Sequence, residues 1–367
     1  MRKQIIAYSI FVLFIFMTSQ VFSEQIKLSL DLEIKEPENI IFNRLNDIAT
    51  DSRNNIYILD DKGKMIYVFS EEGRFLRKIG RPGQGPGEFE RPCSIYIDSK
   101  NVIYILDEQN RRVEIFDSKT NHIKSIKFIN FPSGSGANVI VDKGGNFYIS
   151  GYYRIQNSVI GKFSSTGKLV KHFPLPVMKY KGMELNDFDQ MTVDRYLCGG
   201  LMCFDEEEMI FFSYRWPYLI KILTTEGNEL FQFNRKSNLN WTPFIFRHKD
   251  ESGFLFKGST RSQKIFFLYK NCLVNFIYGL DWEGNPKIKI PQLSVVSKNP
   301  DKYFKIKREF AVLDFYTKEG EFIASTEVDG KIDFLSSDKK GRILGVKQDE
   351  KDIQTIVRYR VDITNNK

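Results

Sequence analysis

The segment Ile48-Ala-Thr-Asp-Ser-Arg-Asn-Asn-Ile-Tyr-Ile-Leu-Asp60 is followed by Ile95-Tyr-Ile-Asp-Ser-Lys-Asn-Val-Ile-Tyr-Ile-Leu-Asp107, which repeats the same pattern. The alignment continues without a gap, so that Phe69 matches Phe116 and Ile79 matches Ile126. A repeat of this length indicates an architecture in which each unit buries its apolar faces against its neighbours. This stretch therefore decides the fold.

Each unit divides into four short strands. In the first unit they cover residues 45–50, 56–59, 65–69 and 75–79, and turns rich in Asp, Asn and Gly separate them. Residues 56–59 form a continuous apolar run, as expected for a strand buried on both faces. Four antiparallel strands in a unit that recurs in tandem predict the blades of an all-β propeller.

The same frame recurs along the rest of the chain. Further units are predicted at Val139, at Met202, near Phe246 (with Phe254-Leu-Phe256 as second strand and Trp282-Glu-Gly284 as hairpin), around Phe310–Val328 and at Leu335. Counting units gives seven blades, and six blades with one long insertion fit the pattern equally well.

The last unit ends one strand short, and an unassigned strand lies near the start. Leu28-Ser-Leu-Asp-Leu-Glu-Ile34 alternates apolar and polar residues, which is typical of a half-buried strand. We expect it to be the outer strand of the terminal blade, because closing a ring of sheets removes exposed edges.

The N-terminus has the composition of a secretory signal. Met1-Arg2-Lys3 precedes an apolar run from Ile5 to Met17, and Val21 and Ser23 stand where a signal peptidase would recognise them. We predict a signal peptide over residues 1–23 and a single propeller domain over 24–367. The protein is then exported, periplasmic or secreted, without a stable membrane anchor after cleavage.

Charge and cysteine content restrict the partners. The net charge of +8 comes from Lys and Arg spread among acidic residues, which predicts a solvated surface and no nucleic-acid binding. A monomer is expected. Cys198 and Cys203 are compatible either with a disulfide that closes a small loop or with two separate thiols.

The segment Gly80-Arg-Pro-Gly-Gln-Gly-Pro-Gly-Glu-Phe89, followed by Pro92 and the Ile95–Phe116 unit, resembles the NHL-repeat propellers. More narrowly, it is similar to the exported bacterial proteins called six-bladed β-propeller, as is the ending Lys331–Ile363. The resemblance implies six blades and no particular reaction.

Few motifs indicate chemistry. The Gly/Pro loop lacks the Gly-Lys-Ser/Thr ending of a phosphate loop, and we interpret it as a connection between blades. Asp60 and Asp107 are interpreted as turn residues and partners of arginines in adjacent blades. The three histidines, His122, His172 and His248, fall in different parts of the predicted blades and cannot form one zinc site. No cofactor is predicted, although calcium held by Asp and Asn oxygens stays open.

Aromatic and arginine residues recur in the loops that join second and third strands. These loops share one face, the top face, with the connections between blades, and aromatic rings beside guanidinium groups suit sugars, peptides or anions. The predicted ligand-binding residues are Arg112, Tyr152, Tyr153, Arg154, Tyr214, Arg215 and Trp216. The leading hypothesis is a binding module for a protein, peptide or glycan. The alternative is a metal-dependent enzyme of the lyase or lactone-hydrolase type, with its site at the central channel.

Overall fold

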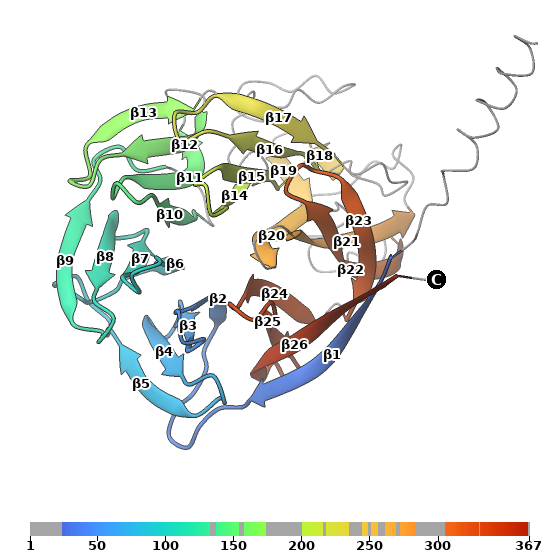
Figure 1. The fold of residues 1–367 in the computed structure, drawn as a ribbon, viewed down its shortest axis with the longest axis horizontal. Helices are drawn as coiled ribbons and strands as arrows, with labels where there is room; N and C mark the ends of the chain where they lie inside the picture. The colour runs from blue at the N-terminus through green and yellow to red at the C-terminus, as the bar shows by residue number, and fades with distance from the viewer. Residues whose placement is uncertain are drawn as a thin grey trace, which may run out of the picture.

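The computed structural model describes residues 24–132, 137–153, 158–173, 200–215, 218–234, 244–248, 251–255, 261–268, 272–283, 305–329 and 331–365. Every regular element in these ranges is a β-strand. Six four-stranded antiparallel sheets stand as blades around a central axis (Figure 1). Within the same ranges no helix is long and apolar enough to cross a membrane.

The first three blades follow the chain in order, from the innermost strand outwards. Their strands are β2 (Leu45–Thr50), β3 (Ile56–Asp60), β4 (Met65–Phe69) and β5 (Phe75–Ile79); β6 (Pro92–Ile97), β7 (Ile103–Asp107), β8 (Arg112–Phe116) and β9 (His122–Lys127); and β10 (Val139–Val141), β11 (Phe147–Tyr153), β12 (Ser158–Phe163) and β13 (Leu169–Phe173).

The last three blades have longer connections, and the sixth draws on both ends of the chain. Their strands are β14 (Gly200–Phe204), β15 (Ile210–Tyr214), β16 (Ile220–Leu223) and β17 (Glu229–Phe233); β20 (Arg261–Leu268), β21 (Cys272–Glu283), β22 (Lys305–Thr317) and β23 (Phe322–Val328); and β24 (Ile332–Ser337), β25 (Ile343–Gln348), β26 (Gln354–Asn365) and β1 (Glu24–Ile34).

The repeated Ile-x-x-Asp motif shapes the turn after each of several inner strands. The carboxylate of Asp51 accepts hydrogen bonds from the backbone N–H groups of Arg53 and Asn55 at 2.9 Å. Asn54 between them has a φ of 60°, in the left-handed region that Asn tolerates well. The same turn recurs at Asp98, Asp142, Asp205 and Asp338. Short-range chemistry therefore sets where the first strand of a blade ends.

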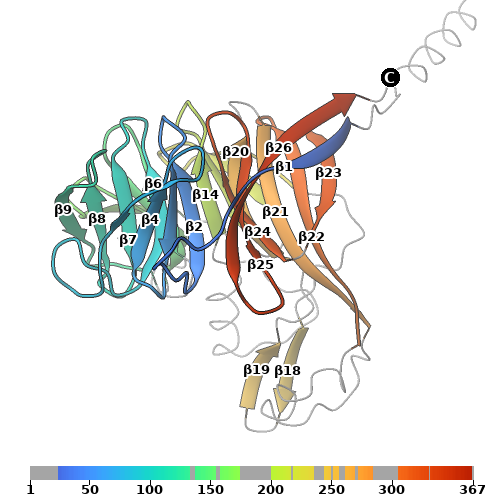
Figure 2. The ribbon, with the colours of Figure 1, turned by 90° about the horizontal axis from the view of Figure 1, so that it is seen from below.

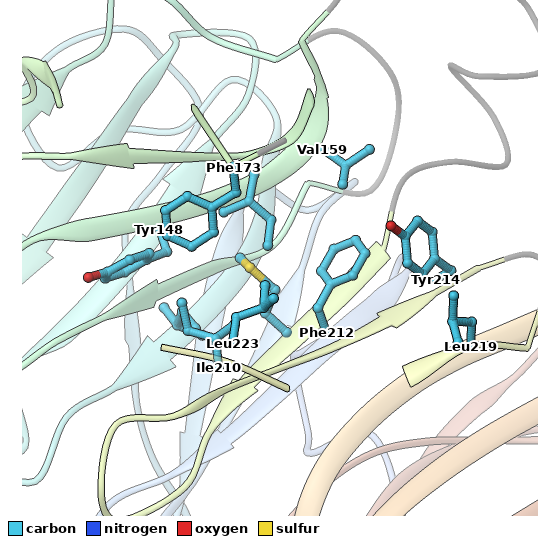
Figure 3. Packing of buried hydrophobic residues seen from close by; sticks show 11 residues of the cluster. Tyr148, Val159, Phe173, Ile210, Phe212, Tyr214, Leu219 and Leu223 are labelled. Atoms are coloured by element: carbon cyan, nitrogen blue, oxygen red, sulfur yellow. The ribbon is translucent and has the colours of Figure 1, made fainter. Parts of the chain in front are cut away.

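The core lies between neighbouring blades. All five residues of β3 are buried, whereas the outer strand β5 is mostly exposed. Ile48 and Tyr67 of blade 1 pack in one cluster with Leu344 of blade 6, and Tyr148 of blade 3 packs with Phe212 of blade 4 (Figure 3). Each blade is thus stabilised by the next one.

The N-terminal strand closes the ring, as predicted. β1 pairs antiparallel with β26 from Glu24↔Asn365 to Ile34↔Ile356, with an irregularity between Leu30 and Leu32. At that irregularity the carboxylate of Asp31 accepts hydrogen bonds from Arg358 and Arg360, both at 2.7 Å. Blade 1 joins this network through Glu71, which forms an ion pair with Arg342 at 2.7 Å and receives Lys340 at 2.5 Å.

The expected fifth unit near Phe246 is wrong, and with it the count of seven. β18 (Phe244–His248) and β19 (Glu251–Leu255) pair only with each other, and Figure 2 shows this hairpin below the ring. Trp282 and Glu283 end β21, which pairs with β22 across residues 284–304. The patterns near Phe254 and Phe310 therefore do not represent two blades, because β20–β23 form one sheet. Alternation indicates that a segment is a strand, but not which sheet it joins.

Candidate functional site

Arg112 lies inside the protein, where it holds the Gly/Pro connection between blades 1 and 2. Its guanidinium group donates to the carbonyl oxygens of Gln84 at 2.7 Å, Gly85 at 2.7 Å and Glu88 at 2.8 Å. Its Nε lies 2.5 Å from a carboxylate oxygen of Glu114, and both side chains are almost fully buried. The interpretation of the loop as a connection is confirmed, and Arg112 is placed as the residue that positions it.

The group around Glu114 brings together side chains that resemble a catalytic set. Glu114 accepts hydrogen bonds from Ser125 at 2.8 Å and lies 2.6 Å from Nε2 of His122. In a hydrolytic triad the carboxylate and the serine contact opposite nitrogens of the imidazole ring. Here the same Nε2 atom faces both Glu114 and Ser125, the latter at 3.4 Å. We therefore interpret these side chains as polar contacts that connect strands β8 and β9.

Three tyrosines that were expected on the top face lie in the core. Tyr152 is 6% exposed, Tyr153 4% and Tyr214 0%. The hydroxyl of Tyr153 donates to the carbonyl oxygen of Ile149 at 3.0 Å, and Figure 3 shows Tyr214 next to Phe212 and Leu219 in the cluster between blades 3 and 4. Tyr152 and Tyr153 end strand β11 and Tyr214 ends strand β15, and their side chains are buried against protein. In this structure they are therefore not available to stack on a ligand in solution.

The other predicted ligand-binding residues have different outcomes. Arg215 is partly exposed at the end of β15. Arg154 and Trp216 lie outside the described residues, as do Cys198 and the signal segment 1–23. Cys203 carries a free thiol. Ligand binding at the top face stays a prediction. Among the predicted binding residues that the structure describes, Arg215 is the one that is partly exposed.

Asp60 and Asp107 bind backbone groups. The Asp60 carboxylate accepts from the N–H groups of Arg44 at 3.0 Å and Gly63 at 2.7 Å, and Asp107 accepts from Glu90 and Arg91 at 3.0 and 2.9 Å. Both side chains are fully buried. Asp60 and Asp107 also accept from the side-chain amides of Asn43 at 3.3 Å and Asn110 at 2.7 Å. Their interpretation as turn residues is confirmed, but their hydrogen-bond donors are backbone amides and asparagines, and not arginine side chains.

The inner strands place one polar residue per blade at a common position in the first three blades. Asp47 accepts from the backbone N–H of Ile95 at 3.0 Å. Ser94 accepts a hydrogen bond from the backbone N–H of Val139 at 3.3 Å. Asn138 accepts one from the backbone N–H of Met202 at 3.0 Å. Each side chain thus joins its blade to the next one. In blade 4 the position belongs to Leu201, which cannot accept, and the series stops.

In blade 5 the same position carries Lys264, and its ammonium group lies 2.5 Å from the carboxylate of Asp47. Lys264, Asp47, Ser94 and Asn138 are therefore engaged with one another or with backbone amides. In the part of the chain that the structure describes, no group of three or more His, Cys, Asp or Glu side chains is placed to hold a metal ion. The calcium site and the channel enzyme stay predictions.

A groove of about 980 Å³ lies where the ring closes, between the outer strand of blade 5 and the paired ends of the chain. It is lined by residues 25–28 of β1, 326–329 at the end of β23, Ile332, Tyr359 and residues 361–364 of β26. Figure 2 shows these ends of β1 and β26 projecting on the side of the ring opposite β18 and β19. No sequence signal marked this groove, because its walls lie at opposite ends of the chain.

The groove has an apolar floor and an acidic rim. Ile26, Leu28 and Val361 pack partly buried on the core between blades 5 and 6. Glu327, Asp329 and Asp362 also line the groove, together with one cation, Lys27, which stands opposite Asp362 in the pairing of β1 with β26. Burial raises the pKa of Tyr359 on this floor, and the nearby Glu33 and Asp329 raise it further. The arrangement suits an apolar ligand that also carries positive charge.

Comparisons with known proteins agree on the fold. A family model described as a 6-bladed beta-propeller matches residues 31–170. A member of the DUF4221 family from Bacteroides vulgatus superposes with a TM-score of 0.60 at 11% identity, over 93% of this chain and 99% of that one. A Bacteroides fragilis protein, provisionally described as exported, gives 0.54 at 11% identity over 92% and 95%.

Other comparisons carry no argument about activity. A streptogramin B lyase superposes with a TM-score of 0.49 at 10% identity, over 94% of this chain and 100% of that one. A search of curated protein sequences finds no match. At such low identity a structural likeness concerns the fold alone, and the narrower likeness to NHL repeats stays a prediction. The chain is a six-bladed β-propeller of four-stranded antiparallel blades.

Proposed function

We propose that this propeller is an exported binding module that holds an extended, cationic peptide segment of a partner protein in the closure groove. The observation that carries the proposal is the groove itself, in which an apolar floor and an acidic rim occur together. The proposal moves the binding site from the loops of the top face to the groove where the ring closes.

The position of β1 supports a ligand in extended conformation. β1 is the outermost strand of its sheet, and its only strand partner among the described elements is β26. Its outer edge can therefore offer backbone N–H and C=O groups to a peptide that adds as a further strand. Alternate side chains of such a peptide would point to the apolar floor, and the others to the carboxylates of Asp329 and Asp362.

The test uses an array of eight-residue peptides in which valine alternates with lysine, glutamate or serine. We expect the full-length protein to retain the valine–lysine peptides. The variant Ile26→Thr/Val361→Thr removes apolar floor but keeps β-branched side chains in the strands, and we expect it to bind at least tenfold more weakly. Asp362→Lys should act in the same direction through charge.

The matched control is Ile41→Thr/Ile353→Thr, which changes two exposed isoleucines outside the groove. This variant should bind like the unmodified protein. If no peptide of the array is retained, or if the groove variant and the control lose binding equally, the groove is not the peptide site.

A further inference from the structure

The six outer strands form a continuous belt around the ring, which we call the outer belt. It consists of β5, β9, β13, β17, β23 and β1, each with the hairpin that precedes it where one exists. The end of one outer strand lies against the hairpin of the next blade. A Cβ atom at Gly167 would lie 2.4 Å from the carbonyl oxygen of Lys127, and one at Gly227 would lie 2.8 Å from the ring of Phe173.

The charges of the outer belt are segregated along it. The belt of blades 1–3 carries eight cations against three carboxylates, Glu71, Glu72 and Asp117. The cations, which we call the basic arc, are Arg74, Arg77, Lys78, Lys119, Lys124, Lys127, Lys168 and Lys171. The belt of blades 4 and 5 reverses this balance, with Lys318 against Glu226, Glu229, Glu319, Glu321 and Glu327.

Most cations of the basic arc are available to a ligand. Lys78, Lys124, Lys127 and Lys168 are exposed, and none of them has an ion-pair partner within the described ranges. Arg74 is 81% exposed, with Glu72 at 3.7 Å. Glu71, one of the three carboxylates, is already paired with Lys340 and Arg342. The exposed pair of Arg74 with Glu72 contributes little energy, so Arg74 can exchange Glu72 for another anion.

Exposed apolar side chains accompany these cations. The second residue of each outer strand in blades 1–3 is exposed by about half: Leu76 by 44%, Ile123 by 52% and Val170 by 54%, as is Leu230 by 51% in blade 4. Lysines on edge strands also prevent strand addition, which accounts for charge on the belt in general. Protection of the edges does not require positive charge on the belt of blades 1–3 and negative charge on the belt of blades 4 and 5.

We propose that the basic arc binds a linear anionic polysaccharide that follows the belt across blades 1–3. The arc is convex, since β5, β9 and β13 succeed one another around one side of the ring (Figure 1). A flat anionic membrane touches such a surface at one blade, whereas a flexible chain contacts all three. Because the edge lysines disfavour strand addition, a polymer bound through its charged groups fits better than a peptide.

Binding is expected to depend strongly on salt, because each carboxylate neutralised on the arc releases condensed counterions. The probe is alginate, a linear polyuronate, titrated into the full-length protein by calorimetry, with neutral dextran as the uncharged comparison. We expect alginate to bind, dextran not to bind, and affinity to fall between about 50 and 200 mM salt.

The decisive variant is Lys124→Gln/Lys127→Gln/Lys168→Gln, which removes three exposed cations of the arc. Its dissociation constant for alginate should rise at least tenfold at low salt, and its salt dependence should be shallower by about two units of slope. The control Lys35→Gln/Lys62→Gln/Lys351→Gln removes the same charge from exposed lysines off the belt and should leave both quantities unchanged.

Three results would overturn the proposal. The first is an alginate titration without heat of binding at low salt. The second is an equal loss in both triple variants, which would show attraction to net charge alone. The third is capture by phosphatidylglycerol vesicles, dependent on the same lysines, without alginate binding; the arc would then serve a membrane surface. None of these results bears on the closure groove, which lies on the acidic part of the belt.

Discussion

The ammonium group of Lys264 lies 2.5 Å from the carboxylate of Asp47, although the two residues stand on the inner strands of blades 5 and 1, with blade 6 between them. Asp47 also receives the backbone N–H of Ile95 in blade 2. One carboxylate therefore connects three blades at the centre of the ring. This connection crosses the place where the two chain ends close the circle.

Asp47→Ala is expected to destabilise the fold much more than Lys264→Met. The first change leaves a largely buried ammonium group and a backbone amide without their acceptor, at a cost of about 3 kcal/mol in the free energy of unfolding. Urea unfolding measures the effect. The double variant Asp47→Asn/Lys264→Met should recover most of the loss, since it keeps the acceptor and removes the charge. A double variant as unstable as Asp47→Ala would contradict this role.

Acid is expected to weaken ring closure. Hydrogen bonds from Lys340 and Arg342 lower the pKa of Glu71 from 4.5 to about 2. Burial raises the pKa of Asp31, but hydrogen bonds from Arg358 and Arg360 outweigh this and leave it lowered. A carboxyl group with a lowered folded pKa stabilises the protein above its unfolded pKa, and this stabilisation is lost as the pH falls through the folded value.

The midpoint of thermal unfolding should therefore fall between pH 4.5 and about 2. Glu71→Gln is expected to lower the midpoint at neutral pH and to flatten its dependence on acid. Glu38→Gln, an exposed change outside the network, serves as the control. If Glu71→Gln and the unmodified protein show parallel pH profiles, closure does not depend on this carboxylate.

Removing β1 is expected to open the ring. A chain without Glu24–Ile34 exposes the edge of β26 and leaves the Arg358 and Arg360 side chains without Asp31. Such an edge favours association between copies. Light scattering should show oligomers, and a synthetic peptide of residues 24–34 should restore the monomer. A truncated chain that stays monomeric and equally stable would show that β1 is dispensable.

Arg112 is predicted to act through the loop it holds. Arg112→Leu leaves three carbonyl oxygens without their donor and removes the cation beside the buried Glu114, which should cost about 3 kcal/mol in unfolding free energy. Limited proteolysis should then cut within Gly80–Phe89. Lys100→Gln, an exposed change outside this loop, should leave the cleavage pattern unchanged. Resistance of Arg112→Leu to the protease would exclude this role.

Substitutions of the neighbouring residues Tyr214 and Arg215 are expected to have different effects, because one side chain packs in the core and the other is a candidate for ligand binding. Tyr214→Ala should lower the free energy of unfolding by about 3–5 kcal/mol, because the ring is fully buried between blades 3 and 4. Arg215→Ala should leave thermal stability nearly unchanged, because the side chain is partly exposed. Differential scanning calorimetry compares the two. A marked loss of stability in Arg215→Ala would make it a structural residue, and the top face would then lose its described candidate.

Much of the fold could be predicted from local sequence. The twin units at Ile48 and Ile95 repeat turn residues as well as apolar residues, and both kinds act within a few positions along the chain. Closure by Leu28–Ile34 was predictable because the last unit lacked one strand. Blade 5 could not be predicted in this way, since β21 pairs with β22 across residues 284–304, and no local pattern encodes such a distant partner.

For the candidate sites, too, local sequence predicted some features, while others depend on residues that are distant in the chain. The sequence by itself determined the all-β blades, their turns and the closing strand, because these depend on short-range periodicity and backbone chemistry. Only the tertiary structure decided that Arg112, Tyr153 and Tyr214 belong to the interior, since burial depends on what the neighbouring blade supplies. It also brought the ends of the chain to β23 as a groove, and collected scattered lysines into one arc of the outer belt.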